Sequence, residues 1–211
     1  MARRNDHSRK QIRELAIQAV LDVVDSDEDA TITARSVAKG MGYTVGTLYL
    51  VFRNLDDLLL QVNSKLLQHL YGDMNVVAQN SEGPRDTIFE LAKCYVSFAE
   101  DHPGRWQLLS HRRDNTLGHD AVENEADNIV EDIFVLVQTE LTRLAPTRDS
   151  KEIAIAARAL WSAIHGICIV TASSHLRRRA HYDARLLVHT LVHTYLSGFM
   201  FDKIESLAPR S

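Results

Sequence analysis

The residues best suited to contact another molecule lie between Thr33 and Leu58. This stretch reads TARSVAKGMGYTVGTLYLVFRNLDDL and predicts two short helices joined by a tight turn at Gly42. The side chains expected to face inward are Val37, Ala38, Met41, Leu48 and Phe52. Because Ala38 is small, the two helices can cross closely. This is helix-turn-helix geometry, in which the second helix is free to enter a major groove of DNA.

The outward face of that second helix carries almost no charge, which is unusual for a solvated surface. It presents Thr44, Val45, Gly46, Thr47 and Tyr49. Hydroxyl groups and small side chains permit close approach to base edges and phosphates. On spacing alone, a helical hairpin with an exposed Thr/Tyr face that binds nothing stays open as an alternative.

Basic side chains flank this face. Arg35 belongs to the first of the two helices and Arg53 follows the second. The N-terminal arm, MARRNDHSRK, adds further positive charge, with Arg4 and Arg9 as candidate contacts. A basic arm of this kind can follow the DNA backbone or reach a minor groove. Since the 211-residue chain has a net charge of -4, any DNA contact must come from such a local patch.

The order of residues in this region resembles the signature of the TetR family of transcriptional regulators, G-V-S-x-G-T-L-Y-x-H-F-x-N-K-E-E-L. The matching runs are GYTVGTLY at 42–49, FRN at 52–54 and DDLL at 56–59, and the similarity covers about residues 8–62. The resemblance implies that the double-stranded DNA contacts include Arg35 and residues 44–47, with the hydroxyl of Tyr49 meeting a phosphate. Val51 and Leu55 stand where the family often has His and Lys, so two phosphate contacts are expected to be lost.

The whole chain is expected to be all-α, because apolar residues recur every three to four positions and only 4 Pro and 9 Gly occur. We predict an N-terminal three-helix DNA-binding domain at 1–54, a connecting helix at 55–80, and a C-terminal helical-bundle effector and dimerisation domain at 81–211. The expected helices cover residues 8–25, 34–41, 44–51, 55–77, 85–101, 105–112, 120–144, 150–176 and 183–204.

The C-terminal part shows no catalytic signature, and it resembles a subgroup of TetR regulators with Trp, His and Gly in a late helix. Here these residues are Trp161, His165 and Gly166; the glycine is expected to let another helix approach closely. Trp161 and His165 share one helix face, so they form either a core pair or the wall of an effector pocket. The candidate residues for binding an unidentified small-molecule effector are Tyr95, Phe98, Trp106, His111, Phe134, Trp161 and His165.

The last two helices are expected to build a homodimer, since the resemblance implies a four-helix bundle made by two subunits. The candidate interface residues are Ile164, Leu187, Leu191, Tyr195 and Gly198. The alternative is that these apolar stripes face only their own core. Together these expectations describe a ligand-responsive repressor that binds a palindromic operator; a DNA-binding dimer that senses no small molecule is the alternative.

Other functions are not expected from this sequence. Cys94 and Cys168 fit buried thiols of a cytoplasmic protein, and no metal or cofactor is expected. His189 and His193 are four apart, but no carboxylate or cysteine completes a metal site. No nucleophile-base motif indicates an enzyme. The polar N-terminus is unlike a secretory signal, and we see no apolar run of the ~20 residues that cross a bilayer.

Overall fold

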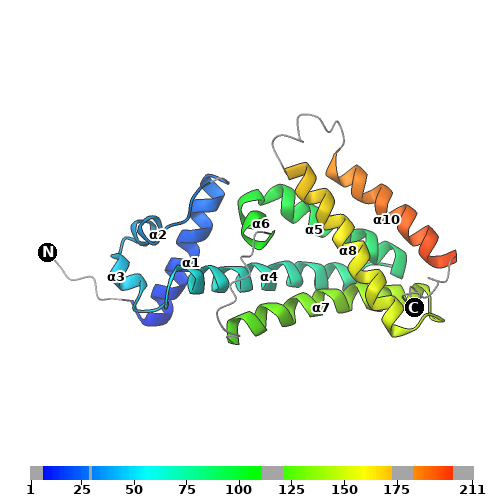
Figure 1. Cartoon of the computed structure of the whole chain (residues 1–211), viewed down its shortest axis with the longest axis horizontal. Coiled ribbons are helices and arrows are strands. Elements are labelled where there is room, and N and C mark those ends of the chain that lie inside the picture. Colours follow the sequence, from blue (N-terminus) through cyan, green and yellow to red (C-terminus); the bar gives the residue numbers. More distant parts are fainter. Residues whose placement is uncertain (1–6, 29, 111–120, 173–182, 202–211) are drawn as a thin grey trace, which may run out of the picture. The chain divides into compact units, whose positions relative to one another are not determined.

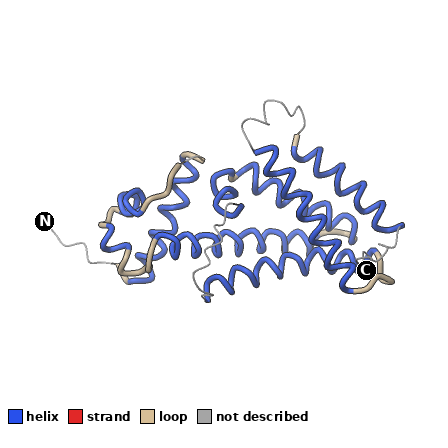
Figure 2. The backbone as a smooth tube through the Cα atoms, in the orientation of Figure 1, coloured by secondary structure: helices blue, strands red, loops and turns tan. Residues whose placement is uncertain are grey.

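The computed structural model describes residues 7–28, 30–110, 121–172 and 183–201. Within these ranges every regular element is a helix and none is a strand, which confirms the all-α fold class (Figure 2). The elements, coloured along the chain in Figure 1, are α1 (Arg9–Ser26), α2 (Ala34–Met41), α3 (Val45–Leu48), α4 (Leu55–Asn80), α5 (Pro84–Asp101), α6 (Pro103–Ser110), α7 (Ala121–Leu144), α8 (Ser150–Ala172) and α10 (Ala184–Phe201).

The ends of the first two helices are set by local side-chain chemistry. Ser8 caps α1 and Thr33 caps α2, each within a capping box that satisfies backbone N–H groups of the first turn. Gly42 ends α2 in the left-handed region, with φ of 72°. These caps and this stop confirm the boundaries expected from the sequence.

Other boundaries differ from expectation for physical reasons. The helix expected to reach Val51 is α-helical only to Leu48, and its last residues form tighter turns in which Val51 N–H donates to the Leu48 carbonyl at 3.1 Å. α6 begins at Pro103 rather than Arg105, because proline lacks only an N–H that the first helical position does not use. The expected ends at 112, 176 and 204 lie outside the described residues.

The described chain divides into two compact units. The N-terminal unit contains the residues up to His69 together with those from His102 to Ile129, and the C-terminal unit contains 70–101 and the residues from Val130 onward. α4 and α7 each contribute residues to both units, and α6 belongs to the unit opposite to that of α5. The domain boundaries at 54 and 80 stay predictions.

The N-terminal unit is built on α1, which packs against α2, α3 and α6. All five residues expected to face inward from the helix-turn-helix are buried, and so is Val51. The α1 residues buried with them are Ala16, Ile17, Ala19, Val20, Leu21 and Val24. The hydrophobic core therefore fixes which face of α3 remains open to solvent.

α6 lies unusually close to the C-terminal end of α1. A Cβ atom on Gly104 would stand 2.2 Å from the Val24 carbonyl oxygen, so only glycine fits this contact. Next to it, Arg105 forms a bidentate ion pair with Asp25, its Nε donating to Oδ1 at 2.8 Å. The hydrogen bond to Arg105 lowers the pKa of the Asp25 carboxyl. Shape and charge together hold α6 on α1.

In the C-terminal unit, α5, α8 and α10 pack against one another, as the neighbouring green, yellow and orange helices of Figure 1 show. Its core is almost wholly apolar. Side chains buried there include Ile88, Leu91, Val96, Leu141, Ile153, Leu160, Val188, Val192 and Leu196. The bundle is therefore stabilised mainly by removal of apolar surface from water.

Gly104→Ala is expected to lower the free energy of unfolding by about 1–3 kcal/mol, since the new methyl group overpacks the contact with Val24. The matched control is Gly72→Ala in α4, where no atom of the described residues lies within 4 Å of a Cβ. That control should gain up to about 1 kcal/mol from helix propensity. Urea unfolding of both variants measures the difference, and equal stabilities would contradict the α1–α6 packing.

Candidate nucleic-acid interface and effector pocket

α3 is a short helix with one buried side and one solvent-exposed side. Leu48 is fully buried on its inner side, whereas Tyr49 is 46% exposed. At the start of the helix, the Thr44 hydroxyl accepts the Thr47 N–H at 3.2 Å, and the two threonine hydroxyls lie 3.0 Å apart. Thr44 and Gly46 are exposed, and Val45 and Thr47 are half-buried. The residues expected to contact bases therefore form one solvent-facing surface of the N-terminal unit.

The candidate arginines differ in how they are held. Arg9 and Arg35 are exposed at the beginnings of α1 and α2. Arg53 is exposed and its guanidinium lies 3.7 Å from the Asp57 carboxylate. Arg4 lies outside the described residues. Three exposed arginines thus belong to the same unit as α3.

The position of α3 depends on Arg13, a contact that the sequence did not reveal. Its guanidinium donates to the Val51 carbonyl at 3.0 Å and lies over the Phe52 ring, 5.7 Å from the centroid. Arg13 therefore ties α1 to the turn after α3. Its partner is a backbone carbonyl 38 residues away, and residue types carry no signal for such a bond.

The turn from α3 into α4 is held by the polar run that resembles the family signature. The Asn54 side chain accepts the Asp57 N–H at 2.7 Å, and the buried Asp57 carboxylate accepts the Arg53 N–H at 2.8 Å. Val51, which replaces the family's frequent His, is buried, and Leu55 is half-buried. Position 51 here therefore serves the core and not the surface.

An aromatic cluster stands in the C-terminal unit. The indole of Trp161 stacks on the His165 ring, with centroids 4.8 Å apart and planes at 14°, and Phe134 meets Trp161 edge-on at 5.7 Å. The Tyr95 hydroxyl lies 2.6 Å from His165 Nδ1. Burial lowers the pKa of His165 and so favours the neutral ring. The neutral ring can accept a hydrogen bond at Nδ1 from the Tyr95 hydroxyl.

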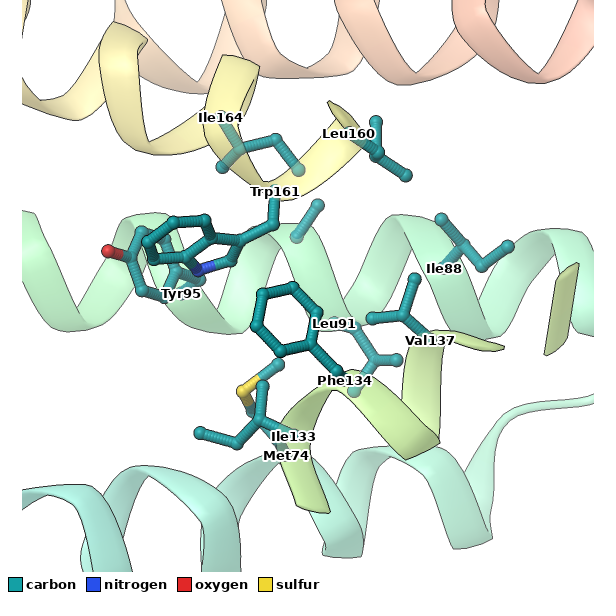
Figure 3. Close-up of a pocket in the computed structure, with 11 residues that line it drawn as sticks. Met74, Ile88, Leu91, Tyr95, Ile133, Phe134, Val137, Leu160, Trp161 and Ile164 are labelled. Atoms are coloured by element: carbon teal, nitrogen blue, oxygen red, sulfur yellow. The ribbon is translucent and has the colours of Figure 1, made fainter. Parts of the chain in front are cut away.

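Beside this cluster lies an apolar pocket, whose lining side chains are shown in Figure 3, with those of Trp161 and Phe134 next to each other. Its cavity is small, about 30 Å³, which is room for about one water molecule. The lining residues are Met74, Ile88, Leu91, Ala92, Tyr95, Ile133, Phe134, Val137, Leu160, Trp161 and Ile164. In this state the side chains themselves fill most of the space.

The candidate effector residues are only partly brought together. Tyr95, Phe134 and Trp161 line the pocket, and His165 completes the cluster through its contacts to two of them. Phe98 is buried on α5 but is not among the lining residues. Trp106 is buried in the N-terminal unit, and His111 lies outside the described residues. The aliphatic lining was missed, because helical spacing alone does not separate pocket walls from core.

The candidate interface residues also divide. Ile164 is buried at the apolar pocket, and the Tyr195 hydroxyl donates to the Ala156 carbonyl of its own unit at 2.8 Å. Leu187 and Leu191 are half-buried, and Gly198 is exposed. Gly166 was expected to admit another helix, but no atom of the described residues comes within 4 Å of a Cβ built there.

Two expectations on composition need correction. Cys94 is half-buried rather than buried, while Cys168 is buried; burial raises their pKa values to about 11 and about 12, so both stay protonated thiols near neutral pH. α8 is long and apolar enough to cross a membrane, against the expectation of no such run, although residue types of this kind also suit a core helix. Among the described residues no group of His, Cys, Asp and Glu is arranged to hold a metal.

Comparison with known proteins places the chain in a family. A family model for the Tetracyclin repressor-like, C-terminal domain matches residues 88–195, about half of the chain. The chain therefore belongs to the TetR family of transcriptional regulators.

Curated relatives are distant. The nucleoid occlusion factor SlmA of Marinobacter nauticus is 28% identical over 51% of this chain, and the match spans only 54% of that factor's length. An uncharacterised helix-turn-helix-type transcriptional regulator of Mycobacterium tuberculosis is 25% identical over 75% of this chain and 69% of its own length.

Solved structures share the fold. FadR of Bacillus subtilis, in complex with stearoyl-CoA, superposes with a TM-score of 0.65 at 15% identity, covering 88% of this chain and 98% of that one. A TetR-family regulator of Bordetella parapertussis gives a TM-score of 0.66 at 13% identity, covering 90% and 97%. At these identities the likeness concerns the fold alone.

The half-buried His165 is expected to make stability pH-dependent. Because burial lowers its folded-state pKa, the unfolded chain binds a proton first as pH falls below the ordinary histidine pKa of about 6.5. Stability should therefore be full above that pH and decrease below it. His165→Gln should reduce this slope in a melting-temperature series from pH 8 to pH 5, whereas Gly72→Ala, which changes no titratable group, should keep the slope. Parallel slopes for His165→Gln and the unchanged protein would exclude the assignment.

Proposed function

We propose that the protein is a homodimeric, ligand-responsive repressor that binds a palindromic DNA operator through α3. The observation that carries this proposal is the solvent-facing surface from Thr44 to Tyr49, anchored by the buried Leu48, in a chain of the TetR family. A surface of hydroxyls and small side chains bordered by arginines is suited to a DNA groove.

In the proposed complex the residues divide by role. Thr44, Val45, Gly46 and Thr47 approach base edges, where small side chains permit close contact. Tyr49 donates its hydroxyl to a phosphate. Four arginines neutralise phosphates of the DNA backbone and supply affinity that does not depend on base sequence, namely Arg4, Arg9, Arg35 and Arg53.

Dimerisation is proposed through a face of α8 that its own unit leaves uncovered. Residues three or four apart along the helix share this face, namely Ile155, Ala159, Ser162, Gly166, Ile169 and Val170. Ile155, Ile169 and Val170 are 54%, 48% and 46% exposed, and on α10 Leu186 is 57% exposed. Apolar residues exposed in a row indicate an interaction surface. The open Gly166 and Gly198 leave room for a second copy, whose two-fold symmetry would repeat α3 at successive major grooves.

The proposed effector is a hydrophobic molecule bound at the aromatic cluster. The pocket is lined almost wholly by carbon, which suits an acyl chain or another apolar body. The stearoyl-CoA held by FadR of Bacillus subtilis, a protein of the same fold, supports this class of ligand. Since the cavity is only about 30 Å³, such an effector must displace side chains of the lining and therefore select another conformation.

A dimer that binds DNA without sensing a small molecule remains the second candidate, and the small volume of the apolar pocket favours it. Titration of the DNA complex with stearoyl-CoA and with palmitate separates the two. Release from the operator that is abolished by Trp161→Ala supports the effector, and unchanged DNA binding at saturating ligand supports the alternative.

Arg35→Ala and Tyr49→Phe are each expected to weaken operator binding about tenfold, or about 1.4 kcal/mol, through loss of one contact. Fluorescence anisotropy on a site selected from random DNA measures this. The matched control is Tyr71→Phe, a half-buried tyrosine of α4 in the C-terminal unit. Unchanged affinity for both the Arg35 and the Tyr49 variants, with melting temperatures preserved, would refute the proposed docking.

Ile169→Glu is expected to convert the dimer into a monomer, since a charge would lie unpaired in the apolar interface. Light scattering after size exclusion should then give the monomer mass of 23.8 kDa instead of twice that value. Val76→Glu places the same charge at a 58% exposed valine of α4 and should leave the dimer intact. An unaltered mass for Ile169→Glu would rule out this face of α8.

A further inference from the structure

The N-terminal unit contains a pocket that the proposed repressor function does not use. Its volume is about 360 Å³, against about 30 Å³ for the apolar pocket of the C-terminal unit. Small-molecule sites in proteins usually have about 300–1,000 Å³. The lining residues are Val24, Glu28, Ala30, Thr31, Ile32, Leu55, Asp56, Leu59, Leu60, Asn63, Gly104, Gln107 and Leu108.

Three parts of the chain supply an apolar wall. The end of α1 and the loop after it give Val24 and Ile32, the first turns of α4 give Leu55, Leu59 and Leu60, and α6 gives Leu108. The close contact of Gly104 with the Val24 carbonyl holds α6 against α1 on one side of the pocket. The pocket is therefore a formed feature of the unit, with an apolar surface on which a small hydrocarbon body can lie.

The polar groups of the pocket favour a positively charged ligand that donates hydrogen bonds. Asn63 is 9% exposed, and its buried Oδ1 has no hydrogen-bond partner among the described residues. An unsatisfied buried acceptor destabilises the folded state, and a hydrogen bond from a ligand donor would remove this cost. Glu28 and Asp56 add two carboxylates, and no lysine or arginine is among the lining residues.

Two arginines that adjoin the lining segments in sequence lie next to carboxylates outside the lining. Arg105 is paired with Asp25, and Arg53 lies by Asp57, which is buried outside the lining. The negative charge of Glu28 and Asp56 is therefore not balanced from within the pocket wall. An ammonium group fits this arrangement, because it has N–H donors for Asn63 and a charge opposite to that of the carboxylates.

We propose that this pocket is a second small-molecule site, which takes a small amphipathic organic cation such as a primary alkylammonium. The Asn63 amide turns to present its buried Oδ1 to the ammonium, which faces Glu28 and Asp56, and the alkyl chain lies on the leucines of α4. Because the walls come from α1, α4 and α6, occupancy raises the stability of the N-terminal unit by ligand linkage.

The test uses the full chain without DNA and hexylammonium as the probe, followed by calorimetry and by NMR of the side-chain amides. Hexylammonium should bind saturably, shift the Asn63 amide signals and raise the melting temperature, whereas hexanol and hexanoate should bind at least tenfold more weakly. Equal binding of all three compounds, or binding of none, overturns the proposal.

Variants locate the probe. Asp56→Asn and Asn63→Leu should each weaken hexylammonium binding about tenfold, and Asn63→Leu should keep the fold because it removes an unsatisfied polar group. Glu14→Gln, which removes an exposed carboxylate of α1 away from the pocket, should leave binding unchanged. Binding that survives both pocket variants but is lost in Trp161→Ala would place the cation at the apolar pocket and refute the site. Since no step needs DNA, either result leaves the repressor proposal standing.

Discussion

The contact of α6 with the end of α1 exists only because residue 104 carries no side chain, and much of the N-terminal unit depends on it. The contact brings Arg105 to Asp25 and places Leu108 in the wall of the larger pocket. It also gives α6 to the N-terminal unit, although α5, one residue away in the chain, belongs to the other. α6 is thereby held on α1, the helix whose Arg13 also donates to the turn after α3.

What the sequence predicted well was chemistry confined to a few neighbouring residues. Ser8, Thr33 and Gly42 mark helix ends because a cap or a left-handed residue acts on its own turn. The inward face of the helix-turn-helix could be predicted for the same reason, because the spacing of apolar residues indicates which side of each helix is buried. The open surface of α3 is then what remains.

What the sequence could not predict depends on partners distant along the chain. In the sequence, Gly104 follows Pro103 and indicates only a break between helices. The reason for a glycine there is its contact with the Val24 carbonyl, eighty residues earlier in the chain. Ile164 and Ile169 lie on the same apolar helix, yet one lines the unit's own pocket and the other is half exposed. Only the packing of α8 against its neighbours decides between them. For the same reason Phe98 and Trp106 could not be separated from the aromatic residues that line the apolar pocket.

The two pockets differ in what a ligand must do to enter them. The hydrophobic effector proposed at Trp161 and Phe134 would have to move side chains that fill the space, so its binding free energy would be coupled to a change of conformation. Such a ligand can shift a population only by its difference in affinity for the two states, which is what a switch requires. The cation proposed at Asn63 would enter a space already formed, so it would stabilise the present arrangement of α1, α4 and α6. If this arrangement is also the one that binds the operator, linkage would make the two proposed ligands oppose each other. The apolar effector would release the DNA, and the cation would raise the effector concentration at which release occurs.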